Sequence, residues 1–171
     1  MKKAFYLSFL LLFLLIIISN NADAQVQSRP SAFQINNPTN QKGTKIMKKS
    51  IFTEKAPMPI GPYSQASQAG NTIYVSGQLP IDPATGKIIE GDIKKEAELV
   101  LNNIKAILEA AGYEMKDIVK TTIFLTDLAN FKIVNEIYGS YFTGNFPARE
   151  TVQVAALPLN GKIEISVIAV K

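Results

Sequence analysis

The fold is decided by residues 92–112, DIKKEAELVLNNIKAILEAAG. Apolar residues recur there at spacings of three and four, as on one face of a helix: Ile93, Ala97, Val100, Leu101, Ile104, Ile107, Leu108 and Ala111. Asp92 is a typical helix N-cap, and Gly112 is typical of a left-handed C-terminal stop. We therefore predict a helix from Asp92 to about Ala111, one face of which packs on a flat apolar partner.

Strands are predicted on both sides of this helix, at residues 63–69, 72–76, 118–125, 150–156 and 162–170. Gly70-Asn71 suits a tight hairpin turn between the first two, and Asn130 can cap a second amphipathic helix. This order predicts an α+β domain in which both helices cover one face of a mixed sheet. The other face would expose apolar side chains, and oligomerisation is an economical way to cover it.

The amino terminus has the layout of a secretory signal. Lys2 and Lys3 precede an uncharged apolar run over residues 4–18, and Ala22-Asp23-Ala24 resembles a cleavage site. We predict a signal peptide over residues 1–24, a flexible linker over 25–49 and one folded domain over 50–171. The protein would then be periplasmic or secreted, without a stable membrane anchor. A second Met-Lys-Lys at Met47 leaves open a cytoplasmic form that starts there.

Composition narrows the chemistry. The 171 residues include no Cys, His or Trp, which removes thiol nucleophiles, the Ser-His triad and the usual zinc ligands. The net charge of +4 arises upstream of Ser50, since residues 50–171 contain eleven Lys and Arg against thirteen Asp and Glu, a net of −2. Because nucleic-acid binders normally cluster basic residues, charge gives such binding no support. No nucleotide- or metal-binding motif occurs, so we predict neither a cofactor nor a metal.

Two charged side chains stand out in the predicted domain. Arg149 is its only arginine and opens a strand, and its planar guanidinium matches a carboxylate. Glu164 interrupts an apolar strand, so alternation would point it away from the core that Ile163 and Ile165 face. A carboxyl group with a raised pKa there could activate water or carry a proton. Ordinary alternatives stay open: a surface ion pair for Arg149 and a solvent-facing position for Glu164.

Three further positions have features of a ligand site. Tyr63 follows the rigid turn Ile60-Gly61-Pro62, which would hold its phenol in place. Ser76-Gly77 ends a predicted strand, where glycine lets a ligand approach the backbone, and Asn135 lies on the second helix. Each also fits a structural role, as a core-edge tyrosine, a strand bulge or an exposed helix position.

Over residues 50–171 the sequence resembles the RidA/YjgF reactive-intermediate deaminases. The resemblance rests on five segments in order: Ile60-Gly61-Pro62-Tyr63, Ser76-Gly77-Gln78-Leu79-Pro80, Val119-Lys120-Thr121-Thr122, Phe146-Pro147-Ala148-Arg149 and Ile163-Glu164-Ile165. It implies a chorismate-mutase-like fold in a homotrimer with ligand clefts between subunits. The implied activity is that of a 2-iminobutanoate/2-iminopropanoate deaminase, which hydrolyses enamines and imines such as 2-aminoacrylate and 2-iminopropanoate to 2-keto acids and ammonia without a cofactor.

The resemblance also implies residue roles. Arg149 corresponds to the family's carboxylate-binding arginine, and Glu164 to the acid associated with the hydrolytic water. Tyr63 is expected to take part in catalysis, while Ser76, Gly77 and Asn135 line the cleft and bind substrate.

One departure follows the Pro-Ala-Arg segment, where many members have Ser-Cys or a similar pair. This sequence has Glu150-Thr151; Thr151 is expected to bind substrate through its backbone N–H, and Glu150 to point away from Arg149. Family members without deaminase activity leave open an alternative, a non-catalytic protein of the envelope that binds small carboxylates or holds unfolded chains. A ribonuclease activity is also attributed to parts of the family, and the charge of the domain argues against it.

Overall fold

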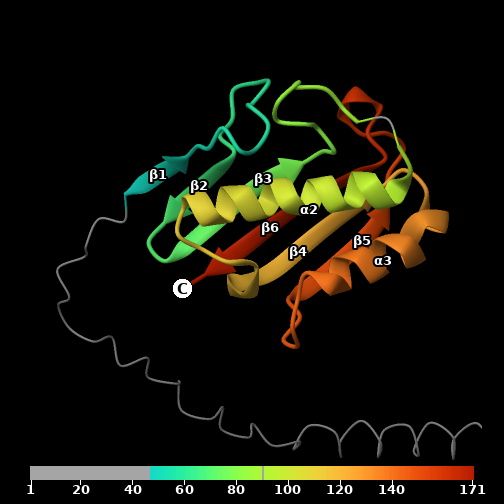
Figure 1. The fold of residues 1–171 in the computed structure, drawn as a ribbon. Coiled ribbons are helices and arrows are strands. Elements are labelled where there is room, and N and C mark those ends of the chain that lie inside the picture. The colour runs from blue at the N-terminus through green and yellow to red at the C-terminus, as the bar shows by residue number, and fades with distance from the viewer. Residues whose placement is uncertain (1–46, 90) are drawn as a thin grey trace, which may run out of the picture. The chain divides into compact units, whose positions relative to one another are not determined.

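Six strands form one mixed sheet in the order β1-β2-β3-β6-β4-β5 (Figure 1). The structure is a computed structural model that describes residues 47–89 and 91–171, so the predicted signal peptide and most of the predicted linker lie outside the described residues. The strands are β1 (Lys48–Ile51), β2 (Ala66–Ala69), β3 (Thr72–Gln78), β4 (Ile118–Leu125), β5 (Ala148–Gln153) and β6 (Ile163–Val170). The longer helices are α2 (Ile93–Ala110) and α3 (Phe131–Ser140).

The sheet is antiparallel except at one edge. Gly70-Asn71 joins β2 to β3 in the expected two-residue turn, with Gly70 at a φ of 61°. β5 lies at the edge and pairs parallel to β4. The two strands can run parallel because α3, which lies between them in the sequence, carries the chain back to the start of the sheet. The parallel pairing fixes which face each β5 side chain occupies, and therefore decides where Arg149 lies.

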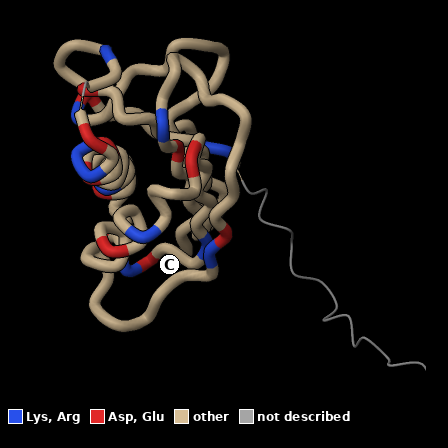
Figure 2. The backbone as a smooth tube through the Cα atoms, turned by 90° about the vertical axis from the view of Figure 1, so that its right-hand side faces the viewer, with Lys and Arg blue, Asp and Glu red and all other residues tan. Residues whose placement is uncertain are grey.

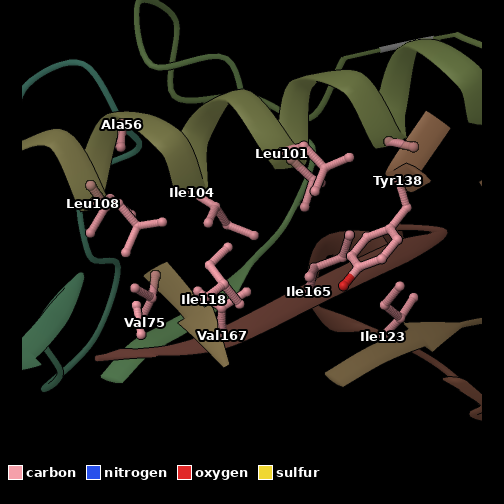
Figure 3. Packing of buried hydrophobic residues seen from close by; sticks show 14 of the residues in the cluster. Ala56, Val75, Leu101, Ile104, Leu108, Ile118, Ile123, Tyr138, Ile165 and Val167 are labelled. Carbon is pink, nitrogen blue, oxygen red and sulfur yellow. The ribbon is translucent and has the colours of Figure 1, made fainter. Parts of the chain in front are cut away.

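Helix α2 supplies most of the helical side of the core. Its N-cap is Asp92, whose carboxylate accepts the N–H of Lys95 at 3.0 Å, and Gly112 stops the chain with a φ of 79°. Leu101, Ile104 and Leu108 are almost fully buried against the sheet (Figure 3). The strands contribute Val75, Ile123, Ile163, Ile165, Val167 and Ala169 to the same cluster. The predicted α+β fold, with both helices on one face, is confirmed.

Three local predictions differ from the structure. β1 begins at Lys48 and was not predicted, because Lys48-Lys49-Ser50 has no apolar alternation. β2 begins at Ala66 rather than Tyr63, since the buried Gln65 side chain donates to the carbonyl oxygens of the preceding loop, such as that of Pro57 at 2.9 Å. Asn130 precedes α3 but makes no side-chain cap; Asp127 caps the short turn before it instead.

The face of the sheet opposite the helices, which we call the open face, carries Tyr74, Ser76, Phe124, Glu164, Ser166 and Ile168. None of these side chains is buried, and Tyr74 is 51% exposed. Neither α2 nor α3 covers this face (Figure 1). Among the described residues, no helix is long and apolar enough to cross a membrane.

Candidate active site in two halves

Arg149 lies on the helix side of the sheet, near the edge. It is paired in register with Thr121 of β4, whose side chain is buried beneath α3. The guanidinium carbon lies 4.9 Å from the centre of the Tyr138 ring and 5.9 Å from that of Phe131. Burial raises the pKa of Tyr138, which therefore stays neutral and donates to the Thr121 hydroxyl at 3.0 Å. Stacking against two rings holds the guanidinium in place without neutralising it.

The guanidinium borders a hollow of about 330 Å³, which we call the Arg149 hollow. Its lining is Asn135, Tyr138, Gly139, Phe146, Pro147 and Arg149. None of the ion pairs formed within the described part of the chain involves Arg149. A half-buried, unneutralised arginine beside an aromatic hollow is suited to a small carboxylate. Asn135 is exposed on the rim of the hollow, so it holds both of the positions considered for it, an exposed place on the second helix and a place lining the cleft.

The two residues after Arg149 point to opposite sides of β5. Glu150 faces away from Arg149, accepts the Thr122 hydroxyl at 2.7 Å and pairs with Lys120 at 3.1 Å. These contacts lower the pKa of Glu150, the hydrogen bond from Thr122 most of all. Thr151 returns to the face of Arg149, and its hydroxyl oxygen is buried without a hydrogen-bond partner among the described residues. The expected alternation is confirmed, so Glu150 does not compete for the Arg149 guanidinium.

Glu164 lies on the open face, opposite Phe124 in the β4–β6 register. The β3–β6 register shifts between Val75 and Gln78, which leaves Ser76 and Gly77 in a bulge. The Glu164 carboxyl lies over this bulge: a Cβ placed on Gly77 would be 1.9 Å from Glu164 Oε1. Glycine is therefore required there to give the carboxyl its place. Burial raises the pKa of Glu164, with no basic partner to oppose it.

The raised pKa of Glu164 predicts a pH-dependent stability. The folded protein binds this proton more tightly than the unfolded chain does, so stability falls as pH rises from the ordinary carboxyl pKa through the raised one. The variant Glu164→Gln avoids this loss. We expect it to be more stable than the original protein at pH 7, with the difference vanishing near pH 4. Urea unfolding at both pH values measures this; Glu136→Gln, at an exposed site, should show no such trend, and a Glu164→Gln difference independent of pH would contradict the assignment.

Tyr63 and Ser76 border a second hollow of about 500 Å³, the Tyr63 hollow. The Tyr63 hydroxyl accepts the Ile60 N–H at 3.3 Å, which bends the turn back on itself. Ser76 donates to the Ser64 carbonyl at 2.7 Å and so fixes the loop to β3. The full lining is Lys48, Gly61, Pro62, Tyr63, Ser64, Ser67 and Ser76. Lys48 and Ser67 are not among the predicted site residues. Lys48 lies in the segment predicted as a linker, and Ser67 lies within a predicted strand, where nothing in the sequence distinguishes it.

The predicted residues thus form two groups. Tyr63, Ser76, Gly77 and Glu164 gather on the open face, around the β3 bulge. Arg149, Thr151 and Asn135 gather on the helix side, at the β5 edge. One protomer therefore does not bring Arg149 and Glu164 together. No group of three or more acidic side chains that could hold a metal ion occurs in residues 47–89 and 91–171.

Several known proteins are similar to this chain in sequence and fold. Residues 53–171 match the family described as Endoribonuclease L-PSP. The 2-iminobutanoate/2-iminopropanoate deaminase of Mus musculus is 50% identical over 74% of this chain and 93% of its own. The structure of RidA from an Antarctic Psychrobacter has a TM-score of 0.70 at 49% identity, covering 72% of this chain and 99% of that one. Escherichia coli TdcF with bound serine has a TM-score of 0.69 at 45% identity, covering 72% and 98%.

The match spans both halves of the site, from the Tyr63 turn to the β6 strand that carries Glu164. Identity near one half over almost the whole length of the mouse relative is far more than fold similarity alone requires. The chain belongs to the RidA/YjgF family.

Proposed function

We propose that this protein hydrolyses short-lived 2-imino acids and their enamine tautomers to 2-keto acids and ammonia. The observation that carries the proposal is that the domain holds both groups the reaction needs: a guanidinium outside every ion pair of the described residues, Arg149, and a half-buried carboxyl of raised pKa, Glu164. A 2-imino acid offers one group to each of them: a carboxylate for the arginine and a basic imine nitrogen for the acid. The mouse relative, which bears the name of this activity, supports the assignment.

The chemistry needs only positioning and one proton carrier. Arg149 binds the carboxylate of the substrate, and the protonated form of Glu164, which its raised pKa favours, donates its proton to the imine nitrogen and makes the carbon more electrophilic. Water adds to this carbon while the Glu164 carboxylate accepts a proton from it, giving a carbinolamine. Return of that proton to nitrogen lets the carbon–nitrogen bond break and releases ammonia, and the remaining hydroxyl gives its proton to the Glu164 carboxylate as the keto group forms, which restores the acid. The net reaction consumes one water, and imines already hydrolyse in water, so modest orientation gives a useful rate.

We propose further that each site is completed by a second copy, in a chorismate-mutase-like homotrimer. The Arg149 group and the Glu164 group lie on opposite sides of the sheet, so the β5 edge of one copy has to meet the open face of another. Two different surfaces meeting in this way form a heterologous contact, which closes into a ring rather than a two-fold dimer. Exposed Tyr74 and half-exposed Ile168 on the open face supply apolar area for the contact.

A coupled assay tests the activity. An amino-acid oxidase acting on alanine generates 2-iminopropanoate, and pyruvate release is followed with and without the purified protein. We expect the protein to accelerate pyruvate release above the rate in buffer, in proportion to its concentration. If pyruvate release is equally fast with and without folded protein, the deaminase proposal is refuted and the non-catalytic carboxylate-binding alternative is favoured.

The family description also names a ribonuclease. The described residues show acidic and basic positions intermixed along the chain (Figure 2), and residues 50–171 carry a net charge of −2. Phosphate backbones are normally bound by clustered Lys and Arg, so the site supports the imine reaction better.

We also propose export to the periplasm, with a cytoplasmic form starting at Met47 as the alternative. The mass of the mature protein distinguishes the two.

A further inference from the structure

The Arg149 hollow is larger than a three-carbon imino acid requires. Its volume of about 330 Å³ falls within the range of about 300–1,000 Å³ that is typical of pockets for drug-sized ligands. Apart from the Arg149 guanidinium and the Asn135 amide, its lining is apolar: the ring of Tyr138, Gly139, Phe146 and Pro147. Space and apolar surface therefore remain beside Arg149 after its guanidinium has bound a carboxylate.

Helix α3 leaves one wall of this hollow open. Asn135, Tyr138 and Gly139 are spaced by three and four residues, so they share one face of the helix. A Cβ placed on Gly139 would meet no other atom within 4 Å, and Gly139 is not among the glycines with a positive φ. Glycine is thus required there neither by the backbone nor by tight packing. Its effect is to leave free the space that a side chain would occupy.

Phe146 presents an aromatic ring to the same hollow. It is 64% exposed, yet its ring is held in place on two sides. The ring centre lies 6.1 Å from that of Phe142, which lies 4.8 Å from that of Tyr138. Pro147 restricts the backbone of the residue before it to extended conformations. An ordered ring that stays exposed beside a hollow favours an apolar occupant, because covering the ring removes it from water.

The position of the hollow next to Arg149 decides what can occupy it. The imine carbon of a 2-imino acid carries a carboxylate, a nitrogen and a side chain. With the carboxylate on Arg149 and the nitrogen directed to Glu164 of the next copy, the side chain is the group left for the remaining space. Among the described residues that line the hollow, Arg149 is the only charged one. A second charge on the ligand would therefore lack a partner there, whereas an apolar side chain needs none.

We propose that the Arg149 hollow receives the side chain of the substrate, so that the protein prefers imines of amino acids with large apolar side chains, such as leucine, over that of alanine. This inference rests on the proposed function, which assigns the carboxylate to Arg149. The side chain lies against Phe146 and Pro147, in the space beside Gly139. The methyl group of the alanine imine leaves most of this space empty.

Oxidase-coupled kinetics compare the imines generated from leucine and from alanine. We expect kcat/KM to be about tenfold higher for the leucine imine, the advantage that added methylene groups give in an apolar pocket. Gly139→Leu fills the hollow and should remove this advantage, while the alanine imine changes by less than about twofold. Gly139→Ala should have an intermediate effect. Ser140→Leu is the matched control: it adds the same side chain to the next residue of α3, outside the lining, and should change neither substrate.

A binding experiment separates this inference from the proposed function. Calorimetry with 4-methyl-2-oxopentanoate and pyruvate measures binding of the two stable keto acids without turnover. Gly139→Leu should weaken 4-methyl-2-oxopentanoate about tenfold and leave pyruvate within about twofold, whether or not the protein hydrolyses imines. Equal binding of both acids by the original protein, or an equal loss of both in Gly139→Leu, would overturn the side-chain site.

Native mass spectrometry of Gly139→Leu provides a second check. Dissociation of the oligomer would also overturn the inference, because the hollow would then receive the neighbouring copy rather than the substrate. An intact oligomer with selective loss of 4-methyl-2-oxopentanoate supports it. Absence of turnover with selective keto-acid binding intact would instead overturn the proposed function alone.

Discussion

Two inactive variants, Arg149→Ala and Glu164→Gln, should restore activity when they are assembled together. Each variant alone should lose on the order of 10²-fold or more in kcat/KM, because one lacks the carboxylate ligand and the other the proton carrier. In the proposed ring, each site would take Arg149 from one copy and Glu164 from the next. Random co-assembly of the two variants then makes about a quarter of all sites complete, and each mixed ring of three copies holds one complete site among its three. Co-expression with two affinity tags and sequential purification isolates the mixed oligomers.

A second mixture provides the matched control. The double variant Arg149→Ala/Glu164→Gln is co-assembled with the original protein. Sites that span two copies leave about a quarter of the activity, whereas sites within one chain leave about half. Native mass spectrometry of the same samples counts the subunits. No recovery in the first mixture, together with half activity in the second, would place both residues of each site in a single chain and refute the shared site.

The two-faced arrangement depends on contacts that the sequence does not display. Alternation around Glu164 predicted its orientation, because an acid between Ile163 and Ile165 leaves a local pattern. The face of Arg149 depends on the parallel pairing of β5 with β4, and specifically on the alignment of Arg149 with Thr121. That register is set by α3 and the length of the loops around it. The residue pattern therefore identifies both side chains, and the resemblance implies clefts between subunits, but only the strand register shows that one chain keeps Arg149 and Glu164 apart.

The same distinction holds across the fold. Local signals placed α2 and β4 well, since helix spacing, Asp92, Gly112 and a β-branched run all lie within the elements themselves. β1 left no such signal, because its polar residues gain order only by pairing with β2. Tyr138 fitted the apolar side of α3, and only the packed structure shows that its ring also faces the Arg149 guanidinium. Non-local pairing thus accounts for most of what the sequence leaves undetermined.

Replacing Gly77 by alanine should remove most of the activity and little of the stability. The added Cβ would lie 1.9 Å from Glu164 Oε1, 2.7 Å from Cδ and 3.0 Å from Cγ, so the carboxyl has to leave the bulge. The Glu164 side chain is flexible and half-exposed, and Gly77 is not among the glycines with a positive φ. Alanine therefore fits the backbone, and we expect a change in unfolding free energy of less than about 1 kcal/mol.

The loss of activity should be close to that of Glu164→Gln, since both changes remove a correctly placed proton carrier. In the double variant Gly77→Ala/Glu164→Gln the two losses of activity should not add. Once Gln replaces Glu164 the proton carrier is already gone, so displacing the side chain at position 164 costs no further activity. Gly91→Ala is the control: its Cβ would only touch the Lys95 side chain, at 3.5 Å, and activity should be retained. If Gly77→Ala were fully active, or if the losses multiplied, Glu164 would act from somewhere other than the bulge. Loss of activity in Gly77→Ala without a matching loss of stability would show that Gly77 is needed to position the Glu164 carboxyl.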